Sequence, residues 1–318
     1  MADEGRLRER DRLLIAEAYH LADYIGDRLW AGWREVPFAV LLVTPEYDFL
    51  IRHPRPTPEF QSLGYDSLLG SEVLVRPHNA NLSLKFEAAF PAVGGLNTVV
   101  IGQPEQTGKS PALWVITALH EHFHQLQTAQ PDHFAALETL DLAGGDQTGM
   151  WQLNHPFPYQ DPAVKARFGT YLAALRAALQ SGSEPGAEKR LGDFLAARAA
   201  LVETLDPPDY RYFSMQLWQE GVARYTEYRV GEMAAEADYQ PLPAFAALAG
   251  FLPYAEVVKG QRQALKQELD SLDIGSWQRV VFYPVGACEA LLLDRHQPGW
   301  RQHYFTDRFY LENYFTKN

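Results

Sequence analysis

Residues 118–127 read ALHEHFHQLQ and concentrate side chains that can bind a metal ion and move protons. His120, Glu121 and His124 satisfy the pattern H-E-x-x-H. In a helix, residues i and i+4 share one face, so the two imidazoles can bind one ion. Glu121 lies about a quarter of a turn from His120 and can accept a proton from a water on that ion. The spacing predicts a hydrolytic zinc centre.

A helix over residues 111–128 must position this motif. Ser110 is a favourable N-cap residue, and Pro111 suits the first helical position. His122 lies between the two proposed ligands but points to another face of such a helix. We therefore expect His122 to be structural or peripheral.

A catalytic zinc usually has three protein ligands and an open position for water. A third histidine at metzincin spacing would fall at position 130, which is Gln130. The short glutamate spacing of thermolysin-like enzymes would fall near Ala143 and Gly144. Neither position supplies a ligand, and a better candidate lies farther along the chain.

Residues 218–228, WQEGVARYTEY, carry a second motif. It resembles the E-G-x-A-x-Y-x-E helix of gluzincin metallopeptidases of the zinc aminopeptidase type, with Glu220, Gly221, Ala223, Tyr225 and Glu227 in register. The resemblance implies that Glu220 is the third zinc ligand. The separation is longer than in that family, because residues 125–219 intervene. We expect this long segment to form a cap or a separate lobe.

The small residues of this motif indicate a close packing contact. A mid-helix glycine costs about 1 kcal/mol in helix stability relative to alanine, so we expect Gly221 to have a structural function that offsets this cost. We expect Gly221 and Ala223 to let their helix approach the His120–His124 helix closely. Glu227 is two turns beyond Glu220 and is either a hydrogen-bond partner of a metal ligand or a solvated charge.

Residues 283–287, YPVGA, resemble the Y-x-x-G-A pattern of the same family. The resemblance implies that Tyr283 stabilises the oxyanion of the reaction. Pro284 suits a helix N1 position, which predicts an extended Tyr283 at the mouth of a helix. The alternative is a tyrosine of the core.

The family also has a glycine-rich substrate-binding strand, of the type G-x-M-E-N, before its catalytic helix. Gly94, Gly95 and Asn97 stand at the matching place, and the glutamate that holds a free amino terminus is absent. We therefore expect that a free amino terminus is not strictly required. His155, in the irregular segment 154–162, is a candidate for lining the cleft. Residues 102–110, GQPEQTGKS, lack the first glycine of a P-loop and are interpreted as a surface loop.

The composition excludes several other classes of protein. The chain has 318 residues, 28 basic against 40 acidic, and a net charge of −12, which disfavours nucleic-acid binding. Cys288 is the single cysteine, so neither an internal disulfide nor a multi-thiolate zinc site is possible. No apolar run approaches the roughly 20 residues that span a bilayer. Residues 1–12 are charged and lack the apolar core of a signal peptide, so we expect a cytoplasmic protein.

Strand-like and helix-like patterns occupy different parts of the chain, which predicts an α+β fold. Strands are expected at 38–43, 72–76, 82–89 and 97–101, with a proline-broken loop at 52–58. Helices are expected at 6–32, 111–128, 131–142, 163–180, 187–204, 209–231, 254–270 and 284–295. The resemblance implies one zincin-like unit: an N-terminal helix and mixed sheet in 1–109, a helical half in 110–318, and a catalytic cleft between them.

Together these patterns predict a zinc metallopeptidase with one zinc ion per chain. Its ligands are His120, His124 and Glu220, its general base is Glu121, and its oxyanion stabiliser is Tyr283. The substrate is a peptide or a small amide, without nucleic-acid or membrane partners, and the oligomeric state is left open. Two alternatives remain: a zinc hydrolase of a non-peptide amide or ester, and a non-catalytic binding protein with a zincin fold.

Overall fold

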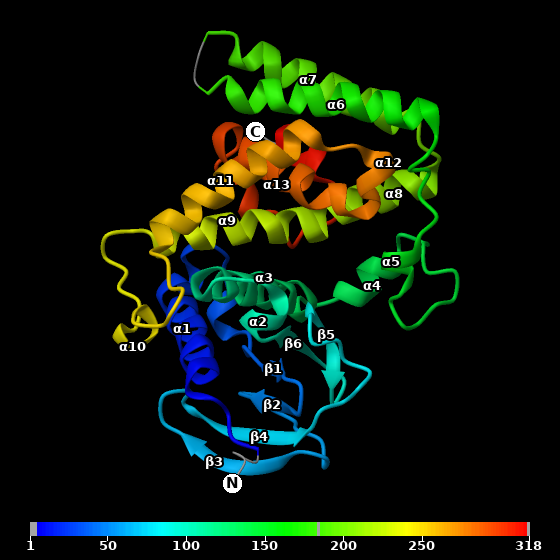
Figure 1. Ribbon diagram of the computed structural model, residues 1–318. Helices are drawn as coiled ribbons and strands as arrows, with labels where there is room; N and C mark the ends of the chain where they lie inside the picture. Colours follow the sequence, from blue (N-terminus) through cyan, green and yellow to red (C-terminus); the bar gives the residue numbers. More distant parts are fainter. Residues whose placement is uncertain (1–4, 183–184, 317–318) are drawn as a thin grey trace. The chain divides into compact units, whose positions relative to one another are not determined.

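The computed structural model describes residues 5–182 and 185–316 (Figure 1). They form two compact units, and each unit combines two stretches of chain. Unit 1 comprises Met1–Ala129 and Glu227–Gln261, and unit 2 comprises Gln130–Thr226 and Arg262–Asn318. A mixed sheet lies in unit 1, and helices make up most of the remaining chain. The expected α+β class is confirmed.

The sheet of unit 1 has six strands in the order β3-β4-β2-β1-β6-β5. Strand β1 pairs parallel with β6, and the other neighbouring pairs are antiparallel. The bounds of the strands are β1 Val40–Val43, β2 Tyr47–Ile51, β3 Gln61–Asp66, β4 Ser71–Pro77, β5 Glu87–Val93 and β6 Leu96–Gly102. The central β1 is buried at every residue, as expected for a strand covered on both faces. Strands β2 and β3 were not predicted.

The longer helices match the predicted ones closely in place. Their bounds are α1 Glu9–Ile25, α3 Pro111–Ala129, α6 Pro162–Gln180, α7 Ala187–Val202, α8 Pro207–Gln216, α9 Val222–Ala234, α11 Tyr254–Ser271 and α13 Phe282–His296. Short helices are α2 Pro104–Thr107, α4 His133–Glu138, α5 Trp151–Asn154, α10 Pro243–Ala246 and α12 Ile274–Trp277. The first helix ends at Ile25, earlier than predicted, because Gly26 adopts a positive φ of 46°.

The strand predicted over residues 82–89 is wrong in its first part. Turns occupy this stretch, in which the Leu82 amide donates to Asn79 and the Phe86 amide to Ser83. Strand β5 begins at Glu87. The alternating apolar residues that mimicked a strand cover the sheet from this loop, where Leu82, Leu84 and Phe86 pack against the buried cluster around Leu41 and Val100.

Two helices cover the sheet of unit 1 on the side that carries the metal motif. Helix α3 packs against α1 and also contacts β5 and β6 (Figure 1). The Trp114 indole donates a 2.7 Å hydrogen bond to the Gly102 carbonyl oxygen, which ties the first turn of α3 to the end of β6. The motif is therefore carried by a helix whose position is set by the sheet.

Unit 2 is helical, and the long segment between the two motifs contributes most of it. Helices α6 and α7 pack against each other as a hairpin. Arg198 of α7 is buried and forms a 2.8 Å ion pair with the buried Glu289 of α13, which accepts a 2.5 Å hydrogen bond from Tyr171 of α6. This polar contact among three helices fixes how the hairpin sits on α13.

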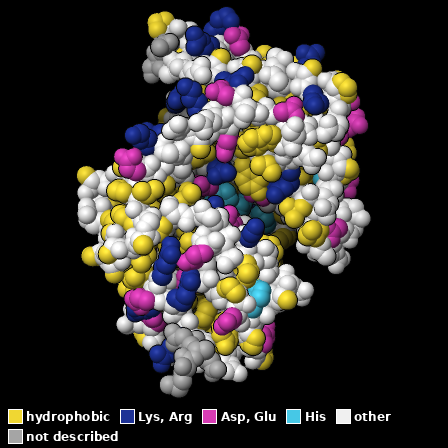
Figure 2. All heavy atoms as spheres, in the orientation of Figure 1, with side chains coloured by type: hydrophobic (Ala, Val, Ile, Leu, Met, Phe, Trp, Pro, Cys, Tyr) yellow, Lys and Arg dark blue, Asp and Glu magenta, His cyan; other side chains and the backbone are white. Residues whose placement is uncertain are grey.

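Charged side chains of both signs are mixed over the molecular face drawn in Figure 2. This face therefore shows no extended stripe of basic side chains. Among the described residues, none of the helices is long and apolar enough to cross a membrane.

Candidate metal centre

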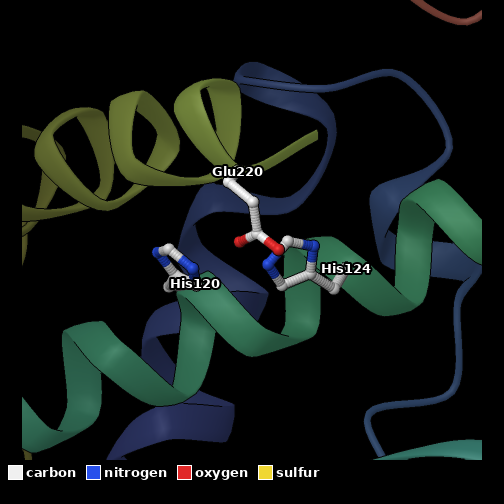
Figure 3. Close-up of side chains that lie close together, drawn as sticks. All are labelled: His120, His124 and Glu220. Carbon is white, nitrogen blue, oxygen red and sulfur yellow. The ribbon is translucent and has the colours of Figure 1, made fainter. Parts of the chain in front are cut away.

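Three side chains that the sequence motifs singled out come together in the structure. His120 and His124 project from α3 toward the carboxylate of Glu220 (Figure 3). Each of the three offers one ligand atom, and these atoms all lie within 4.8 Å of one another. All three residues are buried. Two imidazole nitrogens and one carboxylate oxygen are a donor set that suits a divalent ion such as zinc, so this group could hold a metal ion.

His124 has a partner that orients its ring. Its Nδ1 lies 2.6 Å from Oε1 of Gln127, one helical turn along α3. Because an amide oxygen accepts a hydrogen bond, Nδ1 carries the proton of the neutral ring, and Nε2 carries the lone pair. Protein ligands of metals are commonly held in this way by an outer hydrogen-bond partner.

His120 has a charged partner in the same role. Its Nδ1 lies 3.2 Å from Oε2 of Glu227, whose Oε1 accepts a 3.1 Å hydrogen bond from Gln261. Glu227 is 5% exposed, which is incompatible with a solvated surface charge. Both carboxylate oxygens face polar groups of unit 1, so Glu227 is placed to orient the ring of His120.

Glu121 lies beside the other nitrogen of the same histidine. Its Oε1 is 4.0 Å from Nε2 of His120, and the residue is 5% exposed. A carboxylate at this distance can reach a water molecule placed next to Nε2. This position is what the proposed general base requires.

A third carboxylate, Glu87 on strand β5, lies in the same electrostatic neighbourhood. Burial raises the pKa of the Glu87 carboxyl, and the nearby Lys109 ammonium, 3.1 Å away, opposes that effect. The charge of Glu227 raises this pKa further, and His120 lowers it. Unit 1 therefore places several acidic groups near His120.

Glu220 lies in a π-helical turn, Leu217–Gly221, between α8 and α9. Within unit 2, Gly221 lies against α13, and its expected close approach to the His120–His124 helix stays a prediction. A Cβ on Gly221 would lie 2.4 Å from Cα of Gly286, and a Cβ on Gly286 would lie 2.6 Å from the Leu217 carbonyl oxygen. The two glycines therefore allow the π-helical turn to cross α13 at backbone contact. Turns of this type often occur at functional sites, where they aim a side chain.

Tyr283 is next to Glu220 in unit 2, but its backbone differs from the prediction. It is the second residue of α13, which continues from a 3₁₀ turn at Gln278–Val281, so Tyr283 is helical and not extended. Pro284 is tolerated in the first helical turn because the missing N–H has no partner there in any case. Burial raises the pKa of Tyr283 well above its usual value, the Glu220 carboxylate raises it further, and Arg279 lowers it. Tyr283 is therefore a neutral hydrogen-bond donor.

His122 belongs to a different environment from its two neighbours. Its ring stacks on Phe38, with centroids 4.0 Å apart and planes at 2°, and its Nδ1 lies 2.9 Å from Oε1 of Gln125. Burial lowers the pKa of His122 to about 4. It also lines a pocket of about 250 Å³ with Trp33 and Phe38. The structure places His122 in the packing of unit 1.

The remaining predicted site residues have structural roles in the fold. Gly94 and Gly95 form the hairpin turn between β5 and β6, with φ of 55° and 70°, where L side chains are disfavoured. Asn97 is on β6, an inner strand, and donates a 2.7 Å hydrogen bond to Thr128 of α3. The edge strand on this side of the sheet is β5. Contact of these residues with a substrate stays a prediction.

His155 is held within unit 2. Its Nε2 lies 2.8 Å from Oδ1 of Asp209, and its ring stacks on Tyr212 with centroids 4.3 Å apart. Through these contacts His155 packs against α8. A role in lining a cleft stays a prediction.

Three polar residues near the ligands were missed at the level of sequence. Gln127 had a signal, because i+3 spacing from His124 places both on one helix face. Arg279 had a weaker sequence signal, because it lies only about one helical turn before Tyr283. Glu87 had none, because its position beside the site depends on the pairing of β5 with β6.

Comparison with protein-family models, curated proteins and solved structures gives no significant match.

Proposed function

We propose that this protein is a zinc-dependent metallopeptidase that binds one zinc ion per chain. The observation that carries the proposal is the buried group of His120, His124 and Glu220, whose ligand atoms lie within 4.8 Å of one another. The position of Glu121, 4.0 Å from Nε2 of His120, supports hydrolysis over a purely structural site, because a structural zinc needs no adjacent base.

Three residues would bind the metal ion, and two others would orient the histidine rings. His120 and His124 would hold the ion through Nε2, because Nδ1 of each ring faces an outer acceptor, Glu227 or Gln127. When bound, zinc acts as a Lewis acid that polarises an amide carbonyl and lowers the pKa of water. Glu220 completes the donor set with one carboxylate oxygen.

Proton transfer and charge stabilisation fall to other side chains. Glu121 accepts the proton of the attacking water at a carboxylate oxygen and passes it to the leaving nitrogen. Tyr283 stays protonated and donates its hydrogen bond to the negative oxygen that develops during attack. Its position beside Glu220 places the donor near a ligand of the ion.

The decisive experiment combines metal analysis with turnover. We expect about one zinc per chain in the purified protein, and cleavage of a peptide library that is abolished by a chelator and restored by zinc. Glu121→Gln should keep zinc and fold but lose roughly 10²- to 10⁴-fold in kcat, because an amide cannot accept the proton. Glu138→Gln, in the exposed part of α4, serves as the control and should leave turnover unchanged.

The outcomes separate the proposal from its alternatives. Hydrolysis of esters or small amides without peptide cleavage would indicate the non-peptide hydrolase. Stoichiometric zinc with no hydrolysis of any of these substrates would indicate a non-catalytic binding protein. A protein without bound zinc would refute the proposal itself.

A further inference from the structure

Arg279 lies beside the glutamate ligand and has no role in the scheme above. It belongs to the 3₁₀ turn Gln278–Val281 that leads into α13. Its Nη1 lies 3.5 Å from Oε1 of Glu220 and 3.4 Å from Oε1 of Gln216. Its guanidinium carbon lies 5.4 Å from the ring centroid of Tyr283. The side chain is 24% exposed, so it is largely buried but can be reached from solvent.

The contacts of Arg279 are long for a buried guanidinium. Charge-assisted hydrogen bonds to carboxylates measure about 2.7–2.9 Å, and a guanidinium has five N–H donors to satisfy. Arg198, by contrast, has carboxylate oxygens of both Glu289 and Glu312 at 2.8 Å. In the part of the chain that the structure describes, Arg279 faces the Glu220 carboxylate at 3.5 Å, and its other partners, Gln216 and the Tyr283 hydroxyl, are neutral. Its positive charge is therefore only partly compensated by the fold.

Metal binding makes this imbalance larger. Once Glu220 shares its charge with a divalent cation, it compensates Arg279 less well. A largely buried cation without a full counter-charge is unfavourable, so the site gains free energy when an anion binds there. A carboxylate suits a guanidinium best, because two parallel N–H···O bonds can form.

We propose, as an extension of the proposed function, that Arg279 binds a carboxylate of the substrate. Consecutive Cα atoms are about 3.8 Å apart, so the carboxylate of a C-terminal leaving residue stands within a few ångströms of the scissile amide. Arg279 lies within the same range of a zinc ligand. The substrate class is therefore peptides or N-acyl amino acids that are cut at their last amide bond. This class agrees with the missing glutamate for a free amino terminus, because recognition is transferred to the acidic end.

The first test measures turnover of two substrates by the zinc-loaded protein. One is an N-acetylated peptide with a free C-terminal carboxylate, and the other is its C-terminal amide. We expect the free acid to be preferred in kcat/KM by roughly 10- to 100-fold, and Arg279→Gln to remove that preference by slowing the free acid alone. Arg279→Lys should keep part of it, because the charge remains but the fork is lost.

Two results would overturn the inference. One is a wild-type protein that cleaves both substrates equally well. The other is an Arg279→Gln variant that loses equally on both substrates in kcat, which would make Arg279 a stabiliser of the oxyanion.

A binding experiment separates this inference from the proposed function, because it needs no turnover. The monohydroxamate of succinic acid and its methyl ester both present a metal-binding group, but only the first has a carboxylate. Calorimetry on the zinc-loaded protein should show roughly tenfold or tighter binding of the acid, and equal binding in Arg279→Gln. Arg176→Gln, a partly exposed arginine paired with Asp270, is the matched control and should keep the preference. Equal affinities in the wild type refute the inference and leave the peptidase standing, whereas a protein that binds no zinc refutes both.

Discussion

The surroundings of the histidine pair and of Glu220 are opposite in chemical character. Around His120 and His124, unit 1 supplies acceptors of protons and hydrogen bonds, namely Glu121, Glu227 and Gln127. Around Glu220, unit 2 supplies the donors Tyr283 and Arg279. A hydrolase needs both, because attack by water releases a proton and creates a negative oxygen. In the proposed mechanism, one stretch of chain therefore handles the proton and the other stabilises the negative charge.

Removing a proposed metal ligand from either stretch should have the largest effect on zinc binding. His124→Ala and Glu220→Ala should each weaken zinc binding by at least about 100-fold, more than the 10- to 100-fold that the loss of an outer partner typically costs. Chelator competition on the purified variants measures the affinity. His303→Ala, at an exposed position, is the control. Unchanged affinity in Glu220→Ala would place the third ligand elsewhere.

The donor role of the Glu220 stretch is tested by Tyr283→Phe. Loss of the hydroxyl should lower kcat by roughly 10²-fold, with a smaller effect on KM, because the hydrogen bond forms mainly in the transition state. Steady-state kinetics on the zinc-loaded variant gives both constants. Tyr210→Phe loses a 2.6 Å hydrogen bond to Glu312 in the same unit and should leave kcat unchanged. A normal kcat in the Tyr283 variant would return that residue to the core.

The acceptor role of the histidine stretch is tested by its outer partners. Glu227→Gln and Gln127→Ala should weaken zinc binding by roughly 10- to 100-fold, because each removes the group that holds a ligand ring. We expect the larger loss for Glu227, since a carboxylate stabilises the donor ring more strongly than a neutral amide. Chelator competition is again the measurement, and Glu232→Gln, which pairs with Arg229, is the control. Wild-type affinity in both variants would show that the rings need no such support.

The smallest effect concerns how Glu220 is positioned. Gly221→Ala forces a Cβ to within 2.4 Å of Gly286, and overpacking of this kind costs about 1–3 kcal/mol in the free energy of unfolding. Chemical denaturation measures it. Gly192→Ala is the matched control in α7, where nothing lies within 4 Å of the added Cβ. That substitution should stabilise by up to about 1 kcal/mol through helix propensity. Similar free energies for the two variants would argue against the tight crossing.

Local patterns predicted much of the secondary structure and the parts of the site that lie within one helix. The helix that carries His120 and His124 was predicted from the proline at its start and from residues a few positions apart. Its position was correct, as were those of the other long helices and of β1, β4 and β6. The alternation at 82–86 was wrong as a strand because apolar side chains can cover a sheet from a loop as well as from within it.

The pairing of distant residues was decided by the tertiary structure. The sequence alone marked Gly221 as a costly mid-helix glycine, but its contact with Gly286 follows from the crossing of the π-helical turn with α13. The sequence also left open whether Glu227 is a solvated charge or a partner of His120. Its burial and its 3.2 Å distance from Nδ1 of His120 favour the partner. Local propensity acts through neighbours along the chain. The partners of a buried charge are set by which elements pack together, and this depends on contacts among residues far apart in the sequence.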